Sequence, residues 1–438
     1  MAQIAAIARH LASVGLAAVD PASRVAAALA CGADRPGPAA RAARFTAAAA
    51  VALGKAAAAM ARGAEGALPP AAPRLLIRPH GSPALDDPAW EELTGGHPVA
   101  DGASLAAGER LLEFLGGLGA QERLLALISG GASACLERPA AGLSLADLAA
   151  TQRALLGAGL PIGAVNAVRK HLSTIKGGGA LRACRAPVLA LLLSDVPGDD
   201  PAVVASGPFA ADPSTFAEAA TAVARIGLPA AVAAHLEAGA RGERPETLKP
   251  GDPALARLTT RVLAGPRTVS RAVAEEARRL GFAADEGPLA GEASAAAADL
   301  VARGRRLAGA RVVLALGGET AVTLPAGGGP HSFGQGGRNQ ELALAAAREL
   351  AGRRDESAHE AVLALATDGE DAGTGAAGAI VDGLAWEAMR AAGIDPEAAL
   401  ARHDSNRALA LLPDALLTTG PTGTNAADLA VYIRVRSA

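Results

Sequence analysis

The chain has few aromatic residues, which make up 2% of its 438 positions. So few rings argue against a platform on which nucleic-acid bases stack. Its charge is nearly balanced, with 41 Lys plus Arg against 44 Asp plus Glu, so no broad positive field is available for a polyanion or an anionic membrane surface. We therefore expect no nucleic-acid partner and no membrane partner.

Long apolar runs are missing as well. Hydrophobic residues make up 50% of the chain, too many for a disordered protein, yet no run of about 18 strongly apolar residues occurs. The N-terminal stretch carries Arg9 and His10 in its middle and lacks a basic lead-in, so it predicts an amphipathic helix and not a signal peptide. The default expectation is a cytoplasmic protein.

Cysteine is scarce too. The three cysteines lie far apart and never in a CxxC or Cys/His ligand spacing, which excludes a disulfide framework and a structural zinc site. We expect Cys31, Cys135 and Cys184 to be small buried residues.

Two nucleotide-binding signatures are absent. No GxxxxGK[ST] occurs, and Gly54-Lys55 lacks both the upstream glycine and the following Ser or Thr of a P-loop. The nearest approach to a dinucleotide fingerprint, at 157–163, has the wrong spacing, contains a proline and follows a predicted helix in place of a strand. The sequence thus excludes a P-loop protein and gives only weak support to a dinucleotide site.

The sequence does contain an alternation of strands and helices. Short apolar runs end abruptly in small or polar residues, as buried parallel strands do, and helical stretches such as 144–156 lie between them. The length allows two cores, and the charged, proline-punctuated segment at 239–253 marks the predicted boundary. We expect an α/β protein with an N-terminal domain at 1–240, a linker at 241–253 and a C-terminal domain at 254–438. The predicted strands are 46–53, 74–77, 124–128, 188–193, 261–263, 312–316, 362–366 and 415–417.

Polar residues gather just after these strands. In open α/β sheets, ligands bind beyond the carboxyl ends of the strands. Carboxylates placed there could hold Mg²⁺ or accept a proton. Any one of them alone is more often a helix cap than a ligand, so their shared position carries the prediction. They are Asp195, Asp199, Asp200, Glu319, Asp368 and Asp371.

The densest polar cluster of the first half lies at 166–179. On a helix, Arg169, Ser173 and Lys176 form a stripe beside an apolar one, and the glycines at 177–179 would end the helix with backbone N–H groups open to an anion. The alternative is a solvated basic face with a glycine cap. Ser173 and Lys176 also match the SxxK pattern of acyl-enzymes, but its companion motifs SDN and KTG are absent.

In the second half, a glycine-rich loop at 327–337 runs into Arg338 and an alanine-leucine helix. Loop N–H groups, the helix dipole and the guanidinium would converge on one anion, which predicts a phosphate cradle. The alternative is a surface loop with an asparagine cap at Asn339.

Taken together, these segments resemble the class II glycerate kinases, the glycerate 2-kinase family whose C-terminal half carries the MOFRL region and whose members are also labelled hydroxypyruvate reductases. The similarity covers essentially the whole chain. It implies a Rossmann-like N-terminal domain and a smaller α/β C-terminal (MOFRL) domain, with the MOFRL region at about 311–425 and the active site in a cleft between the domains. The segments that carry it are 168–179, 193–215, 336–341, 366–383 and 419–425.

The resemblance also implies a reaction and a set of site residues. The γ-phosphoryl group of ATP, with Mg²⁺, is transferred to the C2 hydroxyl of D-glycerate, giving 2-phosphoglycerate and ADP. The family's implicated lysine and arginine fall on Lys55 and Arg338. We assign Lys55 to the transferring phosphoryl group or the substrate, Arg338 to a phosphate or the glycerate carboxylate, and Asp195 to the general base. The expected substrate contacts are Ser129, Gly130, Gly131, Ser133, Arg169, Lys176 and Gly177; the expected nucleotide contacts are Gly318, Glu319, Gly337, Asn339, Asp368, Gly369, Thr422 and Asn425; the expected metal ligands are Asp195, Glu319 and Asp368.

Two positions depart from the family pattern. Ala132 stands where the family has glycine, and its Cβ would strain a backbone with positive φ. Gly179 stands where the family has arginine, with Arg182 as a candidate substitute.

Two other functions stay open. One is an NAD(P)H-dependent hydroxypyruvate reductase, against which the missing dinucleotide fingerprint argues. The other is a non-catalytic binder of phosphorylated metabolites, which would need no metal carboxylates. The sequence does not decide the oligomeric state, and a homodimer stays open.

Overall fold

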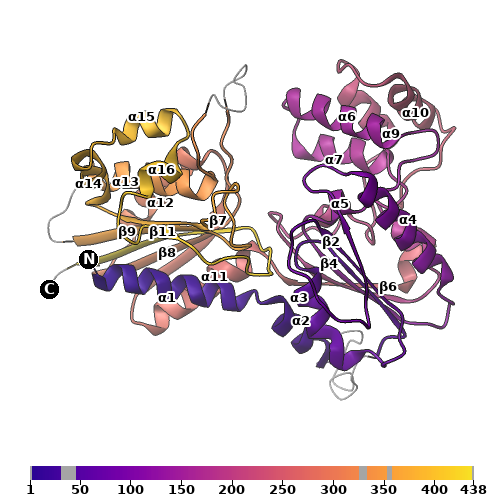
Figure 1. Ribbon diagram of the computed structural model, residues 1–438, viewed down its shortest axis with the longest axis horizontal. Helices are drawn as coiled ribbons and strands as arrows, with labels where there is room; N and C mark the ends of the chain where they lie inside the picture. The colour runs from indigo at the N-terminus through magenta and orange to yellow at the C-terminus, as the bar shows by residue number, and fades with distance from the viewer. Residues whose placement is uncertain (1, 31–45, 325–332, 353–357, 437–438) are drawn as a thin grey trace. The chain divides into compact units, whose positions relative to one another are not determined.

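The computed structural model describes residues 2–30, 46–324, 333–352 and 358–436. Its contacts divide the chain into two compact units, each built around one sheet (Figure 1). The parallel-sheet unit comprises Pro21–Ser194 and Asp199–Leu263. The mixed-sheet unit comprises the first 20 residues, Asp195–Gly198 and Ala264–Ala438.

This division differs from the predicted domains at 1–240 and 254–438. The first helix, α1 (Ala2–Ala18), packs on α11 (Pro266–Arg279) and therefore belongs with the C-terminal half. The predicted linker at 241–253 is a folded part of the parallel-sheet unit, because Leu248 N–H donates to Gly177 O and Leu248 O accepts the N–H of Asp212. Prolines and charges there mark a surface segment whose backbone makes hydrogen bonds to distant parts of the same unit.

The parallel-sheet unit confirms the α/β expectation. Its strands run in the order β3-β2-β1-β4-β5-β6, and β1 to β5 pair in parallel. This is the order of a doubly wound, Rossmann-like sheet, whose switch point lies between the first and fourth strands. The central strands are buried throughout, as their continuous apolar runs predict. The strands are β1 (Ala49–Leu53), β2 (Arg74–Pro79), β3 (Glu91–Gly95), β4 (Leu124–Ser129), β5 (Val188–Leu193) and β6 (Leu258–Ala264).

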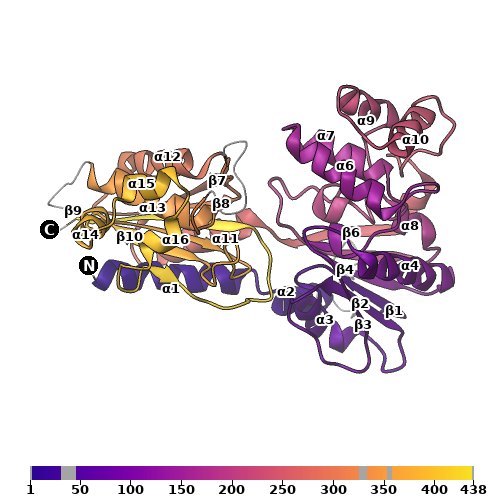
Figure 2. The same cartoon turned by 45° about the horizontal axis from the view of Figure 1, so that its top comes forward.

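The helices of this unit form two groups. One group covers the sheet, and the other, α6 to α10 without α8, forms a separate cluster with its own apolar core (Figure 2). The helix predicted at 144–156 is confirmed as α6, because Ser144 and Asp147 cap its N-terminus reciprocally. The helices are α2 (Pro21–Ala30), α3 (Ala57–Ala64), α4 (Gly102–Gly117), α5 (Ala132–Cys135), α6 (Leu145–Gly157), α7 (Ile162–His171), α8 (Gly179–Ala183), α9 (Phe216–Val223) and α10 (Ala230–Ala240), with short 3₁₀ turns η2 (Glu65–Ala67), η3 (Val204–Ser206) and η4 (Pro253–Arg257).

The mixed-sheet unit is less regular than the sequence predicts. Its strand order is β11-β10-β9-β12-β8-β7. Among the described strands, β7 and β8 pair in parallel, and the other neighbouring strands pair antiparallel. The expectation of parallel strands in this half is therefore wrong, because the last strand, β12, inserts antiparallel between β8 and β9. The strands are β7 (Ala283–Leu289), β8 (Arg311–Gly318), β9 (Ala358–Ala366), β10 (Gly378–Asp382), β11 (Leu416–Leu417) and β12 (Asp428–Arg436).

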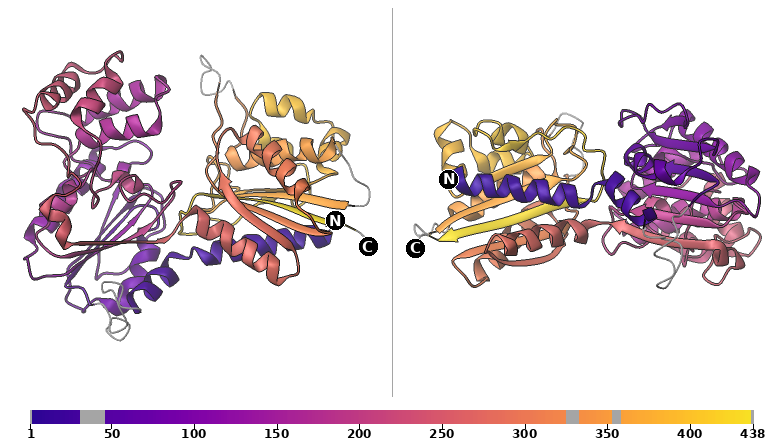
Figure 3. Two further views of the ribbon diagram at one scale, coloured as in Figure 1. Left: turned by 180° about the vertical axis from the view of Figure 1, so that it is seen from behind. Right: turned by 90° about the horizontal axis from the view of Figure 1, so that it is seen from below.

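Helices cover both faces of this sheet. One face carries α1 and α11, and α1 lies along the sheet beside β12 (Figure 3). The other face carries the remaining helices over a core that includes Tyr432. They are α12 (Ala293–Arg306), α13 (Arg338–Ala351), α14 (Ala385–Ala391), α15 (Pro396–Ala401) and α16 (Ser405–Leu409).

Two expectations about the whole chain can be compared with this fold. No single helix in the described ranges is long and apolar enough to span a membrane, and one bent pair, Gln3–Ala18 with Pro21–Ala30, meets the length and composition test jointly. Cys135 and Cys184 are free and buried, as predicted, while Cys31 lies outside the described residues.

Candidate functional site

The turn after β1 carries Lys55 at the carboxyl end of the parallel sheet. Gly54 has φ +106°, and a Cβ there would lie 2.5 Å from the carbonyl oxygen of Ser129, so only glycine fits the turn. Lys55 N–H donates to Gly130 O at 2.9 Å, which joins the ends of β1 and β4. Gly131 gives the lysine stem room, because a Cβ on Gly131 would lie 2.9 Å from Lys55 Cγ. The sequence therefore places this lysine at the switch point, where open α/β sheets bind ligands.

The predicted substrate contact Ser129 has a structural task. Its hydroxyl donates to Leu53 O at 3.2 Å and accepts the N–H of Ala56 at 3.0 Å, and the residue is fully buried. Ser129 therefore braces the turn that presents Lys55. The strain expected at Ala132 is absent, because Ala132 begins α5 and the positive φ, +83°, lies at Gly131.

A second group of predicted substrate residues does come together. Arg169, on α7, donates from one terminal nitrogen to Ser133 Oγ at 2.8 Å. Lys176 forms a buried ion pair with Glu137, a residue that the sequence did not single out. Glu137 also accepts a hydrogen bond from Ser173 Oγ at 2.6 Å. Two members of the expected polar stripe, Arg169 and Lys176, therefore line one cavity together with Ser133 and Glu137, while the third, Ser173, does not line it.

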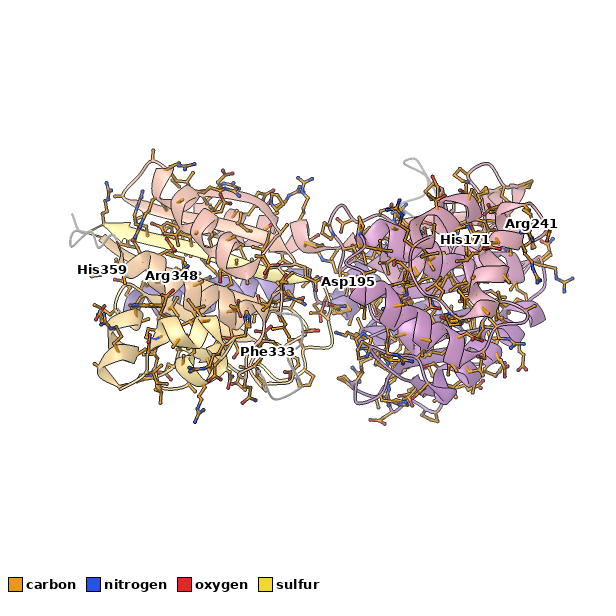
Figure 4. All side chains as sticks on the ribbon, turned by 90° about the horizontal axis from the view of Figure 1, so that it is seen from above. His171, Asp195, Arg241, Phe333, Arg348 and His359 are labelled. Atoms are coloured by element: carbon orange, nitrogen blue, oxygen red, sulfur yellow. The ribbon has the colours of Figure 1, made fainter. Side chains whose placement is uncertain are left out.

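The backbone of the same segment differs from the prediction. Helix α7 ends at His171 (labelled in Figure 4), so residues 172–178, which include Ser173 and Lys176, are not part of a helix. The glycine N–H groups are not open to an anion, because Gly177 N–H donates to Ser206 O at 3.0 Å and Gly178 N–H donates to Gly207 O at 2.8 Å. Gly177 therefore holds the turn together. The departure at Gly179 fits this packing, since a Cβ there would lie 2.1 Å from Thr174 O.

In the mixed-sheet unit, Arg338 begins α13 and is already paired. Its Nε and one terminal nitrogen donate to the two carboxylate oxygens of Asp428 at 2.5 and 3.0 Å, and its other terminal nitrogen lies 2.6 Å from Glu319. Asp428 has a side-chain exposure of 1%, and burial raises its pKa to about 6 although Arg338 opposes the shift. Burial would lower the pKa of Arg338, but the two carboxylates hold it above the usual range.

The predicted phosphate cradle at the start of α13 holds a carboxylate of the chain itself. Asp371 accepts the backbone N–H of Gln340 at 2.9 Å and that of Asn339 at 3.4 Å. Gly337 makes room for it, because a Cβ there would lie 2.3 Å from Asp371 Cγ. Burial raises the pKa of Asp371. The dipole of this helix therefore stabilises an internal anion, and residues 327–332 of the glycine-rich loop lie outside the described residues.

Asn339, a predicted nucleotide contact, is buried. Its exposure is 1%, and neither its amide nitrogen nor its amide oxygen makes a hydrogen bond of normal length and angle to a described residue. Gly318, at the end of β8, is buried as well. Asn339 is buried and Gly318 has no side chain, so neither residue offers an exposed side chain to a ligand.

The remaining predicted residues lie on two loops of the mixed-sheet unit that touch each other. Gly369, with φ +88°, packs so closely that a Cβ would lie 2.0 Å from Gly420 O. Thr422 N–H donates to Asp368 O at 3.2 Å. Asn425 Nδ2 donates to Asp195 Oδ2 at 2.9 Å, which orients the predicted general base (Asp195 is labelled in Figure 4).

The predicted metal ligands do not form a closed site. Across the described ranges, no three His, Cys, Asp or Glu side chains are grouped so that they could hold a metal ion. Glu319 is engaged with Arg338, while Asp195 and Asp368 lie on loops. Mg²⁺ usually takes one or two carboxylates and otherwise binds water and substrate phosphates, so this arrangement fits an ion that arrives with a nucleotide.

Sequence reasoning missed Glu137, Ser206 and Asp428. Asp428 bonds to Arg338 across 90 residues of sequence, and Ser133 Oγ lies 2.8 Å from Ser206 Oγ across 73. No spacing in one sequence reveals such pairs. A signal exists for Asp428 alone, because a carboxylate at the start of the apolar run 428–433 is expected to need a cationic partner.

Comparisons with known proteins cover most of the chain. Residues 7–238 match a domain of unknown function, DUF4147, and residues 312–428 match the MOFRL family. A glycerate 2-kinase of Pyrococcus horikoshii is 38% identical over 78% of this chain and 77% of its own length. A D-glycerate 2-kinase of Thermotoga maritima is 37% identical over 81% and 82%, and a putative hydroxypyruvate reductase of Agrobacterium vitis is 39% identical over 86% and 85%.

Solved structures resemble the chain over its full length. The crystal structure of a glycerate kinase from Thermotoga maritima matches with a TM-score of 0.82 at 32% identity, covering 99% of this chain and 100% of that one. A Pyrococcus horikoshii crystal structure matches with a TM-score of 0.76 at 35% identity and covers 99% of both chains.

Proposed function

The chain belongs to the glycerate 2-kinase family that joins a DUF4147 region to a MOFRL region, and on that premise we propose that it transfers the γ-phosphoryl group of ATP to the C2 hydroxyl of D-glycerate. The products are 2-phosphoglycerate and ADP. The observation that supports this function most strongly is the 37–38% identity to two glycerate 2-kinases over about four fifths of the chain.

Phosphoryl transfer asks a protein chiefly to position the reactants and to stabilise charge on the transferred group. We assign that charge stabilisation to Lys55, whose stem lies along Gly131 at the carboxyl end of the parallel sheet. Asp195, oriented by Asn425, is the proposed general base for the C2 hydroxyl. Arg338 is proposed to meet a phosphate oxygen with the N–H bonds that it does not give to Asp428 and Glu319.

Nucleotide and metal contacts are proposed for the two loops of the mixed-sheet unit. Asp368 and the close-packed Gly369 lie just after β9, and Thr422, on the loop before β12, donates its N–H to Asp368 O. When Mg²⁺ is bound with ATP, it neutralises phosphate charge, and Asp368, just after β9, is the proposed protein ligand. We place the enzyme in the cytoplasm, where free Cys135 and Cys184 stay reduced.

Cofactor dependence tests this function against the reductase and the non-catalytic binder. We expect purified protein to release ADP from ATP only when D-glycerate is present. ADP release should stop when the magnesium is chelated, because the negative charge on the phosphates is then no longer neutralised. The measurement is a coupled ADP assay, with D-glycerate omitted as the control. NADH consumption in step with hydroxypyruvate loss would instead establish the reductase, and absence of ADP release would favour the binder.

A further inference from the structure

The parallel-sheet unit holds a cavity with one polar wall and one apolar wall. The polar wall includes Ser133, Arg169 and Lys176, and the apolar wall includes Leu145 and Leu148 of α6. All of these residues belong to one compact unit. The cavity therefore presents a few fixed polar groups on an apolar background, which is the usual form of a small-molecule site.

The charges on the polar wall do not cancel. Lys176 and Glu137 form an ion pair with side-chain exposures of 3% and 5%, and they neutralise each other. Arg169 is a second cation on the same wall, and burial lowers its pKa while Glu137 opposes the shift. Among the described residues, Arg169 has no carboxylate within 4.0 Å and donates one hydrogen bond, to the Ser133 hydroxyl. The wall thus carries one uncompensated positive charge.

An uncompensated charge in a partly buried place is costly unless an opposite charge binds to it. The planar fork of a guanidinium matches a carboxylate, with which it can form two parallel hydrogen bonds. Only one N–H of Arg169 is donated to Ser133, so other N–H groups of the guanidinium are free to donate to a bound carboxylate. The cavity is therefore suited to a small carboxylate.

A strained turn brings the buried Ser206 hydroxyl into contact with Ser133, the hydroxyl of the polar wall. Ala205, Ser206 and Gly207 have φ values of +53°, +62° and +63°, and for the two residues with a Cβ this conformation is unfavourable. The turn is held because Ser206 O accepts the N–H of Gly177. As a result, Ser206 Oγ lies 2.8 Å from Ser133 Oγ and fixes the hydroxyl that accepts a hydrogen bond from Arg169.

We propose that this cavity binds the carboxylate of D-glycerate, with Arg169 as its anchor, the Ser133 hydroxyl as a hydrogen-bonding partner and Ser206 as the residue that positions Ser133. The assignment rests on the proposed function and deepens it. Arg338 is the less suitable anchor, because it already makes two hydrogen bonds to Asp428 and an ion pair with Glu319. Lys176 and Glu137 are positioning residues: they hold the polar wall without contacting the substrate.

The test compares D-glycerate with its amide, D-glyceramide, which keeps both hydroxyls and lacks the charge. We expect Arg169→Met to raise the KM for D-glycerate by roughly 10²-fold, since one partner of a desolvated charge pair is lost. The KM for ATP should stay near the wild-type value. The preference for D-glycerate over D-glyceramide, measured as the ratio of kcat/KM values, should be lost in the same variant. Arg153→Met is the matched control, because Arg153 is an exposed arginine on α6 and does not line the cavity.

The same experiment on Arg338→Met separates the two candidate anchors. Loss of the carboxylate preference in Arg338→Met, with that preference intact in Arg169→Met, would overturn the assignment. If Arg169→Met does not fold, Arg169→Lys replaces it, and a wild-type KM and preference in Arg169→Lys would equally count against a bidentate anchor. Failure of the proposed function is distinguishable from these outcomes, because wild-type protein would then release no ADP with D-glycerate.

Discussion

Lys55→Ala is expected to lower kcat for D-glycerate and ATP by about 10²-fold or more, equivalent to about 3 kcal/mol of transition-state stabilisation. The reason is that negative charge on the transferring phosphoryl group would lose a point charge held at the switch point of the parallel sheet. The fold should be retained, because Ser129 and Gly130 hold the backbone of the turn through three hydrogen bonds that the substitution leaves in place. Steady-state kinetics measure kcat, and urea unfolding checks that the fold is retained.

Lys249→Ala is the matched control for that variant. Lys249 is one of only four lysines in the chain, lies in the same unit, and binds Glu246 and the Ser214 carbonyl. Its loss should affect stability more than turnover. A near-normal kcat in Lys55→Ala would remove Lys55 from the chemistry.

The Arg338–Asp428 pair gives the second large effect. Arg338→Met should destabilise the fold at pH 8 by about 3 kcal/mol, because it leaves the buried Asp428 carboxylate without a cation. This value is at the lower end of the range for buried pairs, because the Arg338 side chain is 35% exposed. Thermal or urea unfolding at several pH values measures the loss.

The sign of the pH dependence follows from the Asp428 pKa. Arg338 lowers that pKa, so its removal raises the pKa further above the value of about 6 that burial gives it in the native chain. A carboxyl whose folded pKa exceeds its unfolded value binds a proton more readily when folded, so stability is present at low pH and is lost as pH rises through the folded pKa. The deficit of Arg338→Met should therefore shrink at pH 5 and grow toward pH 8.

A double variant separates structure from catalysis at this pair. Arg338→Met with Asp428→Asn should recover most of the stability and lose most of its pH dependence, because the buried charge is gone. Activity should stay low if Arg338 meets a phosphate. Arg338→Lys should fold better than Arg338→Met and still turn over poorly, since a point charge cannot replace the planar fork. Full activity in Arg338→Lys would show that only the charge is needed there.

The parallel-sheet unit could be predicted well from the sequence, and local signals explain why. A buried apolar run that ends at Gly54 predicts both β1 and the turn that carries Lys55. Ser144 and Asp147 predict the start of α6, because a capping box is a local interaction. The chain order of apolar runs was enough to place these elements in an α/β sheet.

The mixed-sheet unit was harder to predict because its decisive contacts join distant segments. An apolar run does not reveal whether a strand pairs in parallel, so the antiparallel insertion of β12 between β8 and β9 could not be read from 428–436. For the same reason, two partners could not be predicted: Asp428, which binds Arg338 and lies 90 residues away, and Asp371, which caps the α13 N-terminus and lies about 30 residues away. At these positions a basic motif alone predicts an anion-binding site that is open to a ligand. In the structure, carboxylates of the chain itself bind there and would compete with an external anion.

The position of the new phosphate tests the proposed function most directly. Enolase dehydrates 2-phosphoglycerate to phosphoenolpyruvate without phosphoglycerate mutase, so enolase is added to a reaction of purified protein, D-glycerate, ATP and Mg²⁺ and phosphoenolpyruvate is followed. A carboxylate held by one anchor leaves the C2 hydroxyl one carbon nearer to it than the C3 hydroxyl, and positioning of this kind can be worth about 7 kcal/mol. We predict phosphoenolpyruvate at the rate of ADP release with no mutase present. Phosphoenolpyruvate that forms only after mutase is added would identify 3-phosphoglycerate as the product and contradict the assignment to glycerate 2-kinases.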